Sequence, residues 1–161
     1  MKKGVKFVWS KECEASFSNL RAILLSQPVL VAPNFNLPFK LAVDACDTGA
    51  GAVLLQEDEF QVEHPVAYFS KKFSPAQKNY STIEKELLAL ILGLQHFSFY
   101  LCPGDGPIVI YSDHNPLRYL SKFREKNQRL TRWSLYLQEF SLEIKHIKGK
   151  ENVIADFLSR M

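Results

Sequence analysis

The sequence predicts an α/β domain in which a five-stranded mixed sheet carries helices on both faces. Three strand-like runs come first, and the connections between them are short enough for antiparallel hairpins. Two further strands then alternate with helices, so that the full order of elements is βββαβααβα. This order is typical of one mixed sheet that is covered by helices on both sides.

The composition is that of a globular protein and excludes several other classes. Hydrophobic residues make up 47% of the 161 residues and charged residues 23%, which excludes a disordered chain. No apolar run is long enough to cross a bilayer, and the first residues are too mixed for a signal peptide. The three cysteines are too far apart for a disulfide framework or a zinc pattern, so we expect a reducing, intracellular setting. The net charge of +3 permits a polyanionic partner without requiring one.

The N-terminal part is predicted to be a separate segment. Apolar residues recur at roughly helical spacing over residues 11–25, which predicts a helix. Pro28 and Pro33 end this helix and open an irregular stretch. We therefore expect the chain to divide into residues 1–37 and residues 38–161.

The second part contains the predicted strands and most of the helices. Strands are expected at residues 39–44, 50–56, 65–70, 108–111 and 141–147. The fourth run is continuously apolar, which predicts a strand that is buried on both faces. Helices are expected after Ser74 and Ser81, because each serine precedes Gln or Glu by three residues, as in a capping box. The second of these helices runs to about Tyr100, and shorter helices are expected at residues 116–120, 127–139 and 152–158.

Four acidic residues occupy positions that solvation alone does not explain. Asp44 and Asp113 end strands, Glu86 lies at the edge of the apolar stripe of the long helix, and Asp156 lies among apolar residues of the last helix. A buried carboxylate is costly, and several that converge also repel one another. A divalent cation would offset both costs, and ligands that are all oxygen suit Mg²⁺. Two such ions about 4 Å apart activate a water and stabilise the leaving oxygen of a phosphodiester.

Each acid also has a simpler explanation. A carboxylate at a strand end is usually a turn or helix cap, and one beside an apolar helix face is usually a solvated edge residue. Spacing in the sequence does not show that the four meet in space.

Four segments of the chain resemble one known family. They resemble, in the family's order, the four motifs of the ribonuclease H domain of gypsy-type long-terminal-repeat retrotransposon reverse transcriptases. These segments are residues 43–54, 80–89, 111–117 and 146–160. The upstream part, from about Phe7 to Phe39, resembles the segment that joins the polymerase to the nuclease. No polymerase motif is present, so the chain resembles the tail of a longer polyprotein, and residues 1–37 a remnant of that connecting segment.

The resemblance implies a ribonuclease-H-like fold and a set of catalytic residues. Asp44, Glu86, Asp113 and Asp156 would be the catalytic, metal-binding carboxylates, holding two Mg²⁺ ions for which Mn²⁺ can substitute. Glu86 is chosen over Glu84 because the family's acid directly precedes a Leu-Leu-Ala stretch. His146 would be a mobile catalytic histidine that assists proton transfer or product departure. The alternative for this residue is a strand-end histidine with no catalytic part.

The same resemblance suggests contacts to the nucleic acid. Asn115 and Asn152 would touch the substrate, although Asn115 is equally explained as a turn residue and Asn152 as a helix cap. Lys148 and Lys150 would contact phosphates beside the terminal acid. Lys145 belongs to the same cluster, and Arg129 and Arg132 are further candidates that share one helix face. All of these could instead be solvated surface charges, and for Lys71 and Lys72 that explanation is favoured. The chain departs from the family at Cys46, where Ser is frequent, and at Phe157, where Ala is common and where the larger ring puts the placement of Asp156 in doubt.

These features predict endonucleolytic hydrolysis of the RNA strand of an RNA–DNA hybrid. The hybrid would be recognised by its backbone shape and 2′-hydroxyls. The expected partners are the hybrid and the polymerase domain of the parent polyprotein, with no membrane. The rival hypothesis is a catalytically silent retroelement fragment, or a host-adopted module that binds nucleic acid or protein.

Overall fold

The computed structural model describes residues 8–26, 30–101, 106–113 and 128–161. The chain divides into two compact units, Met1–Val31 and Ala32–Met161. The first unit contains helix α1 (Lys11–Ser26), as the apolar spacing predicts. Ser10 accepts a hydrogen bond from the backbone N–H of Cys13 at 3.3 Å and so caps the first turn. None of the helices described is long and apolar enough to cross a membrane.

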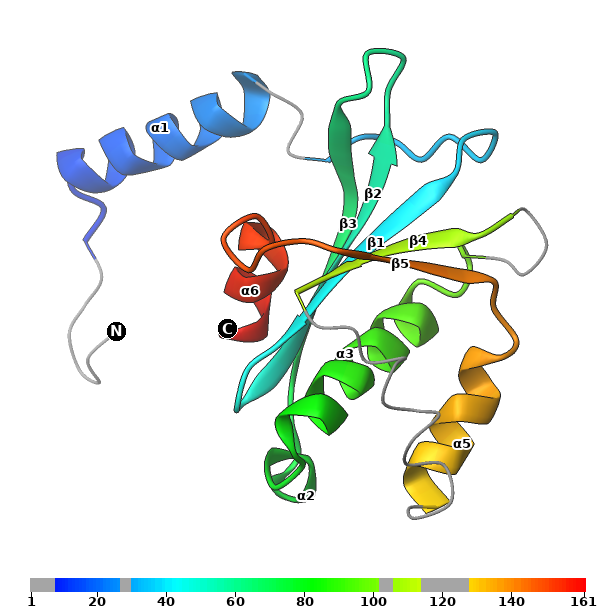
Figure 1. Cartoon of the computed structure of the whole chain (residues 1–161). Helices are drawn as coiled ribbons and strands as arrows, with labels where there is room; N and C mark the ends of the chain where they lie inside the picture. The colour runs from blue at the N-terminus through cyan, green and yellow to red at the C-terminus, as the bar shows by residue number, and fades with distance from the viewer. Residues whose placement is uncertain (1–7, 27–29, 102–105, 114–127) are drawn as a thin grey trace. The chain divides into compact units, whose positions relative to one another are not determined.

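The second unit is built on the predicted five-stranded sheet (Figure 1). Its strands lie in the order β3-β2-β1-β4-β5. They are β1 (Phe39–Ala45), β2 (Gly49–Glu57), β3 (Glu63–Lys72), β4 (Ile108–Ser112) and β5 (Leu142–His146). The first three form the expected antiparallel meander, and β4 and β5 are added parallel to β1. The prediction of a mixed sheet is therefore confirmed.

Helices lie on both faces of this sheet, as Figure 1 shows for α3 and α6. They are α2 (Pro75–Lys78), α3 (Thr82–His96), α5 (Gln128–Leu137) and α6 (Val153–Ser159). Both predicted capping boxes form, at Ser74 before α2 and at Ser81 before α3. Helix α3 ends four residues earlier than predicted, and the segment to Tyr100 forms turns instead. The predicted helix at residues 116–120 lies outside the described residues.

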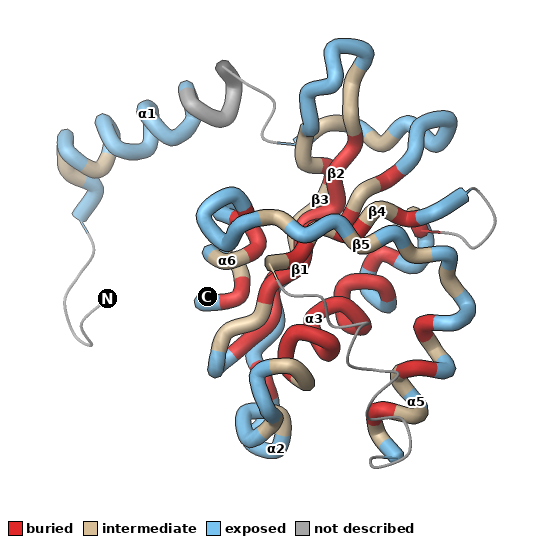
Figure 2. Tube along the Cα trace, viewed as in Figure 1, coloured by how far each residue is buried: buried red, intermediate tan, exposed pale blue. Residues whose placement is uncertain are grey.

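Two close approaches hold the helices on the sheet. In α3, which is buried along most of its length (Figure 2), Gly93 lies so near Leu41 and Val43 that a Cβ atom would come within 3.5 Å of each. On the other face a Cβ at Gly51 of β2 would lie 2.2 Å from the carbonyl oxygen of Ala155. A larger residue at position 51 would push α6 away, so Gly51 sets the contact between α6 and the sheet.

The prediction that β4 is buried on both faces needs correction. Ile108, Ile110 and Ser112 are buried, but Val109 and Tyr111 are only half-buried. Helix α6 packs mainly against β1, β2 and β3, so it covers these strands more than β4. A cavity of about 400 Å³ opens there, with Tyr111 and Ile154 in its wall.

Candidate metal centre at the ends of β1 and β4

Three of the predicted acids meet at one edge of the sheet. Strands β1 and β4 are parallel, so their C-terminal ends lie together. Asp44 is the sixth of the seven residues of β1, and Asp113 directly follows β4. Helix α3 brings Glu86 to the same place. One carboxylate oxygen from each of Asp44, Glu86 and Asp113 lies within 4.8 Å of the other two.

Burial and mutual repulsion make this cluster of three acids unfavourable when all are charged. Asp44 is 7% exposed and Glu86 only 3%. Burial, followed by the charges of Asp44 and Asp113, raises the pKa of Glu86 to about 8. Burial also raises the pKa of Asp44, against an opposing hydrogen bond from Ser159. A set of three oxygen ligands under this electrostatic strain fits a hard divalent cation.

Asp156 lies outside this cluster. It is on α6, is half-exposed, and accepts hydrogen bonds from Nε and Nη2 of Arg160 at 2.9 and 2.5 Å. The guanidinium lowers the pKa of Asp156. The carboxylate is still near enough for its charge to raise the pKa of Asp44. The structure therefore brings three acids together and leaves the fourth beside them, paired with a cation of the protein.

The structure separates Glu86 from its neighbour Glu84. Glu84 completes the capping box at Ser81 and forms an ion pair with Arg129. It is thus occupied at the start of α3, while Glu86 lies among the acids.

His146 is close to this edge but is not part of the acid cluster. It is the last residue of β5, is exposed, and is paired in register with Ser112, the residue before Asp113. The backbone N–H of Ile147 donates to the carbonyl of Ser112 at 3.1 Å, so the loop after β5 starts beside Asp113. This position is compatible with both interpretations of the histidine.

The loop between β5 and α6 carries the predicted lysines. Lys148 and Lys150 are exposed on either side of Gly149. A Cβ at Gly149 would lie 3.2 Å from Oδ2 of Asp113, so the backbone of this loop packs against the carboxylate. Lys148 and Lys150 therefore flank a point of contact with the acid cluster. Asn115, the other predicted contact on this side, lies outside the described residues.

The expectation for Asn152 needs correction. Its side chain is 4% exposed and Nδ2 donates to the carbonyl oxygen of Val43 at 2.8 Å, so it is not available to the nucleic acid. The alternative of a helix cap is confirmed in position, because Asn152 is the N-cap residue of α6, but its side chain makes no cap bond and is bonded to Val43 instead. The sequence does not distinguish these roles of Asn152, because its hydrogen bond to Val43 depends on where β1 and β4 stop pairing in the folded protein.

The remaining basic residues divide into occupied and accessible groups. Arg129 pairs with Glu84 and lies 3.8 Å above the ring of Tyr80, so it is engaged inside the protein. Lys71 and Lys72 are exposed at the end of β3. Because β3 runs in the same direction as β1, these lysines lie at the edge of the sheet that carries Asp44. Exposed lysines thus stand on both sides of the three acids.

Both departures from the family pattern are accommodated. The thiol of Cys46 donates to the carbonyl oxygen of Ser159 at 2.8 Å and so joins the end of β1 to the end of α6. The side chain of Phe157 is 64% exposed, so its bulk does not press on Asp156. The ion pair from Arg160 was not anticipated, although its spacing of four residues from Asp156 on a helix is the pattern that predicts such a pair.

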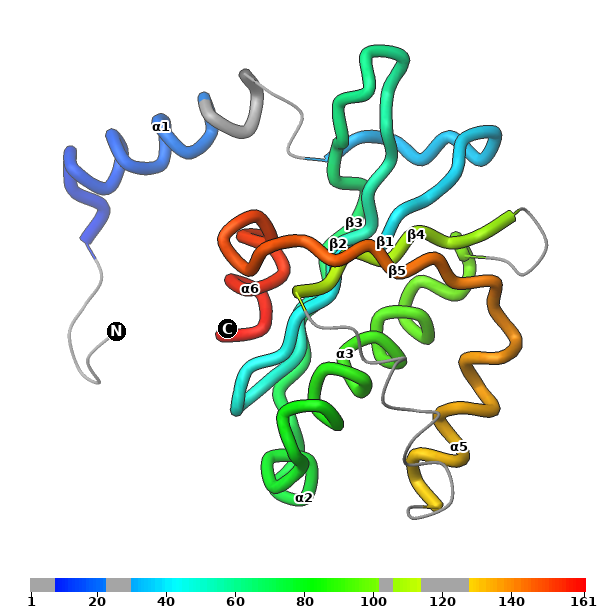
Figure 3. Tube along the Cα trace, in the orientation of Figure 1, coloured from blue at the N-terminus to red at the C-terminus, as the bar shows by residue number. Residues whose placement is uncertain are grey.

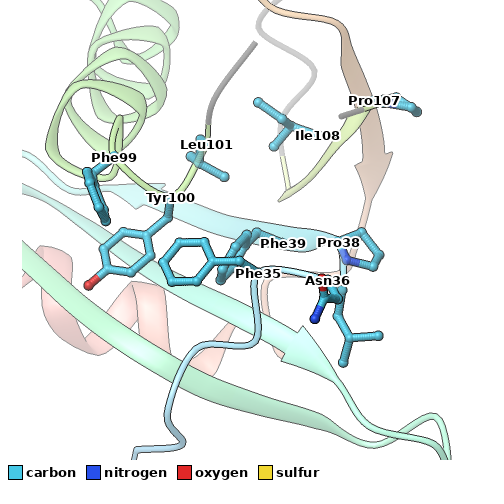
Figure 4. Close-up of a pocket in the computed structure, with 11 residues that line it drawn as sticks. Phe35, Asn36, Pro38, Phe39, Phe99, Tyr100, Leu101, Pro107 and Ile108 are labelled. Carbon is cyan, nitrogen blue, oxygen red and sulfur yellow. The ribbon is translucent and has the colours of Figure 1, made fainter. Parts of the chain in front are cut away.

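The other end of the sheet has a different character. A cavity of about 470 Å³ lies at the start of β1, lined by aromatic and aliphatic side chains (Figure 4). Phe35 stacks on Tyr100 with ring centroids 6.1 Å apart, and Phe39 packs edge-on against both. Asp44 follows Phe39 by five residues, or about 17 Å of extended strand. No acidic residue lines this cavity within the described ranges, so the candidate metal centre is at the opposite end.

Comparison with known proteins agrees with this arrangement. Residues 34–140 match a family model described as the RNase H-like domain found in reverse transcriptase. The chain is 42% identical over 146 residues to the retrovirus-related Pol polyprotein from transposon opus of Drosophila melanogaster, covering 91% of this chain and 14% of that polyprotein. It is 40% identical over 163 residues to the transposon Tf2-3 polyprotein of Schizosaccharomyces pombe, covering 100% of this chain and 12% of the polyprotein. The chain therefore spans about an eighth of the length of these relatives.

Two solved structures have the same fold. One is the foamy viral protease-reverse transcriptase in complex with RNA/DNA hybrid, with a TM-score of 0.61, 18% identity, and coverage of 91% of this chain and 20% of that one. The other is LC11-RNase H1 in complex with RNA/DNA hybrid, with a TM-score of 0.51, 18% identity, and coverage of 76% and 92%. At these identities the likeness concerns the fold alone. The family match and the transposon relatives together show that the chain belongs to the RNase H-like domains found in reverse transcriptases.

Proposed function

We propose that this chain hydrolyses the RNA strand of RNA–DNA hybrids with the help of two Mg²⁺ ions, as the nuclease part of a retroelement reverse transcriptase. The observation that carries the proposal is the convergence of Asp44, Glu86 and Asp113 from three different elements to within 4.8 Å. Three buried or half-buried carboxylates at one point are costly without a cation, and oxygen ligands favour Mg²⁺ or Mn²⁺.

The four acids have different parts in this proposal. Asp44, Glu86 and Asp113 would hold metal directly, and Asp156 would contribute after release of its ion pair with Arg160. When bound, two such ions activate a water and stabilise the leaving oxygen. Glu86 holds a proton near neutral pH in the metal-free chain, because burial and its neighbours raise its pKa to about 8, and it releases that proton when a cation takes its place. His146, exposed at the end of β5, moves a proton or assists product departure.

The exposed lysines support binding of a polyanion at this edge. Lys148 and Lys150 lie on the β5 side of the acids, and Lys71 and Lys72 lie on the β3 side. A hybrid that crosses the acid cluster would place phosphates near both pairs, and phosphate contacts supply most of the affinity of such complexes. Two proteins with this fold are known in complex with RNA/DNA hybrid, which supports the same substrate here.

The polymerase domain of the parent polyprotein is the proposed protein partner. The relatives are polyproteins of which this chain matches about an eighth, and the match to the Tf2 polyproteins covers the whole chain, upstream residues included. We accordingly assign residues 1–37 to the segment that connects polymerase and nuclease, residues 38–161 to the nuclease, and the protein to an intracellular setting.

A cleavage assay with labelled hybrid tests the proposal. The RNA strand should be cut in Mg²⁺ or Mn²⁺ and left intact with chelator, while DNA duplex of the same sequence is not cut. Asp113→Asn should remove the activity and retain the circular dichroism spectrum of the parent. No cleavage by the parent in either metal, or equal rates for parent and variant, would reject the assignment.

The alternative is a catalytically silent binding module. The pairing of Asp156 with Arg160 favours it, because the fourth acid is already neutralised by the protein. Hybrid binding that is unaffected by chelator, together with no cleavage, would support this alternative.

A further inference from the structure

We propose that Asn152 is a positioning residue that sets the distance between Asp156 on α6 and the acids at the ends of β1 and β4. This inference rests on the proposed nuclease function. It replaces the expected contact between Asn152 and the substrate by a role inside the protein.

The side chain of Asn152 is bonded at the point where two acid-bearing strands stop pairing. The parallel register between β1 and β4 ends at Ala42 and Tyr111. The carbonyl of the next residue, Val43, accepts the 2.8 Å hydrogen bond from Nδ2 of Asn152. Val43 directly precedes Asp44, so the amide of Asn152 holds the backbone beside the first acid.

The backbone of Asn152 extends this connection to the other acids. Its N–H donates to the carbonyl of Gly149 at 3.2 Å, in the loop that packs against Asp113. Its carbonyl accepts the N–H of Asp156 at 3.0 Å in the first turn of α6. Figure 3 shows the trace running from β5 through this loop directly into α6. One residue is therefore bonded to the strand that carries Asp44, to the loop that packs against Asp113, and to the helix that carries Asp156.

Other side chains hold the opposite end of α6. Ser70 of β3 donates to the carbonyl of Leu158 at 2.7 Å, and Cys46 donates to that of Ser159 at 2.8 Å. Without the Asn152 amide, α6 would remain attached at its C-terminal end while its first turn loses its bond to β1. The expected consequence is displacement of Asp156 relative to Asp44, with the helix still folded.

The expected effect is that of a residue supporting metal ligands. Loss of such a supporting bond typically costs about 10- to 100-fold in metal affinity or activity. Asn152→Ala should therefore lower kcat by about 10- to 100-fold and weaken Mn²⁺ binding, with little change in KM for the hybrid. Ser70→Ala is the matched control, because it also removes one side-chain bond to α6, at the end away from Asp156.

The experiment compares the parent, Asn152→Ala, Asn152→Asp and Ser70→Ala by Mn²⁺ titration, by kcat and KM, and by melting temperature. Asn152→Asp keeps the shape of the side chain without its N–H donor, so it carries the test if the alanine variant does not fold. The inference predicts that the Asn152 variants lose far more kcat and Mn²⁺ affinity than Ser70→Ala at a similar melting temperature.

Equal losses for Ser70→Ala and the Asn152 variants, or parental kcat and Mn²⁺ affinity in the latter, would overturn the positioning role. A parent chain that neither binds Mn²⁺ nor cuts hybrid would instead overturn the proposed function and this inference with it. The behaviour of the parent thus separates the two failures.

Discussion

The acid cluster at the strand ends and the acid on α6 differ in how their charge is balanced. Asp44 and Glu86 are buried with raised pKa values, whereas Asp156 is half-exposed and Arg160 lowers its pKa. The charges of the cluster therefore oppose one another, while the fourth acid is paired with a cation of the protein. Under the proposed function, this difference predicts that a metal ion binds the cluster of three first, and that recruitment of Asp156 requires the loss of its ion pair with Arg160.

The largest expected effect is on the rate of cleavage, when one acid of the cluster and the acid on α6 are each substituted. Asp113→Asn should reduce cleavage below detection, because it removes a ligand from the cluster itself. Asp156→Asn should leave measurable cleavage, because Asp156 joins only after it leaves Arg160. Initial rates on labelled hybrid in Mn²⁺ check both, and a variant at Asp156 that is as inactive as Asp113→Asn would remove the distinction between the regions.

His146 should have a smaller effect than an acid of the cluster, because it lies at the edge of the centre without joining it. His146→Ala should lower kcat by about 10²-fold or less and leave the hybrid dissociation constant nearly unchanged. Rapid-quench cleavage and a binding titration in Ca²⁺ would measure the two quantities. An altered affinity with parental kcat would assign His146 to phosphate contact or structure instead.

Substitution of the lysines that flank the centre should have a smaller effect, and on hybrid binding instead of cleavage. Because few basic side chains of the described residues are accessible there, we expect micromolar or weaker hybrid binding with a salt slope of about three to four phosphates. Replacing Lys148 and Lys150 by Ala should reduce that slope by about two. Fluorescence anisotropy at several salt concentrations measures the slope, with Lys71 and Lys72 to Ala as the comparison. A nanomolar dissociation constant at physiological salt, or a slope that is unchanged in the variant with Lys148 and Lys150 replaced, would show that the binding surface lies elsewhere.

Without metal, removing the charge of an acid should change the melting temperature in opposite directions in the cluster of three and at Asp156. The folded-state pKa of Glu86 is raised from 4.5 to about 8, so the folded protein keeps a proton that the unfolded chain has lost. The free energy of unfolding therefore falls as pH rises from about 4.5 to 8, and the full penalty is present above that window. Glu86→Gln cannot ionise, and at pH 8 in chelator it should melt about 5 °C higher than the parent, equivalent to about 1–2 kcal/mol.

Asp156→Asn should instead melt at or slightly below the parental temperature, because it loses an exposed ion pair of small value. At pH 4, where Glu86 is protonated in both states, the advantage of Glu86→Gln should disappear. Thermal melts at the two pH values would contradict the account if Glu86→Gln were destabilised at pH 8.

Most of the fold could be predicted because it depends on local patterns. The positions of the strands, the short turns and the capping boxes at Ser74 and Ser81 depend on neighbouring residues, and all are found in the structure, although β3 is ten residues long where six were expected. The half-exposure of Val109 and Tyr111 could not be predicted from an apolar run, since it depends on how far across the sheet α6 reaches.

The site, like the fold, could be predicted from the sequence only where local patterns determine it. Strand-end positions and an apolar helix edge indicated Asp44, Asp113 and Glu86, but their approach to 4.8 Å requires the parallel pairing of β1 and β4. The role of Asn152 depends on where that pairing stops, which no local pattern encodes. The competition of Arg160 for Asp156 was predictable from helical spacing, yet whether a metal ion displaces it depends on electrostatics at the assembled centre.

The most direct test of the central claim is a titration of Mn²⁺ onto the parent chain, Asp113→Asn and Asp156→Asn, followed by electron paramagnetic resonance. The account predicts that the parent binds Mn²⁺, that Asp113→Asn loses the tighter site, and that Asp156→Asn keeps this site and loses only the weaker one. Unchanged tight binding by Asp113→Asn, or loss of all binding in Asp156→Asn, would contradict a metal centre built first on Asp44, Glu86 and Asp113.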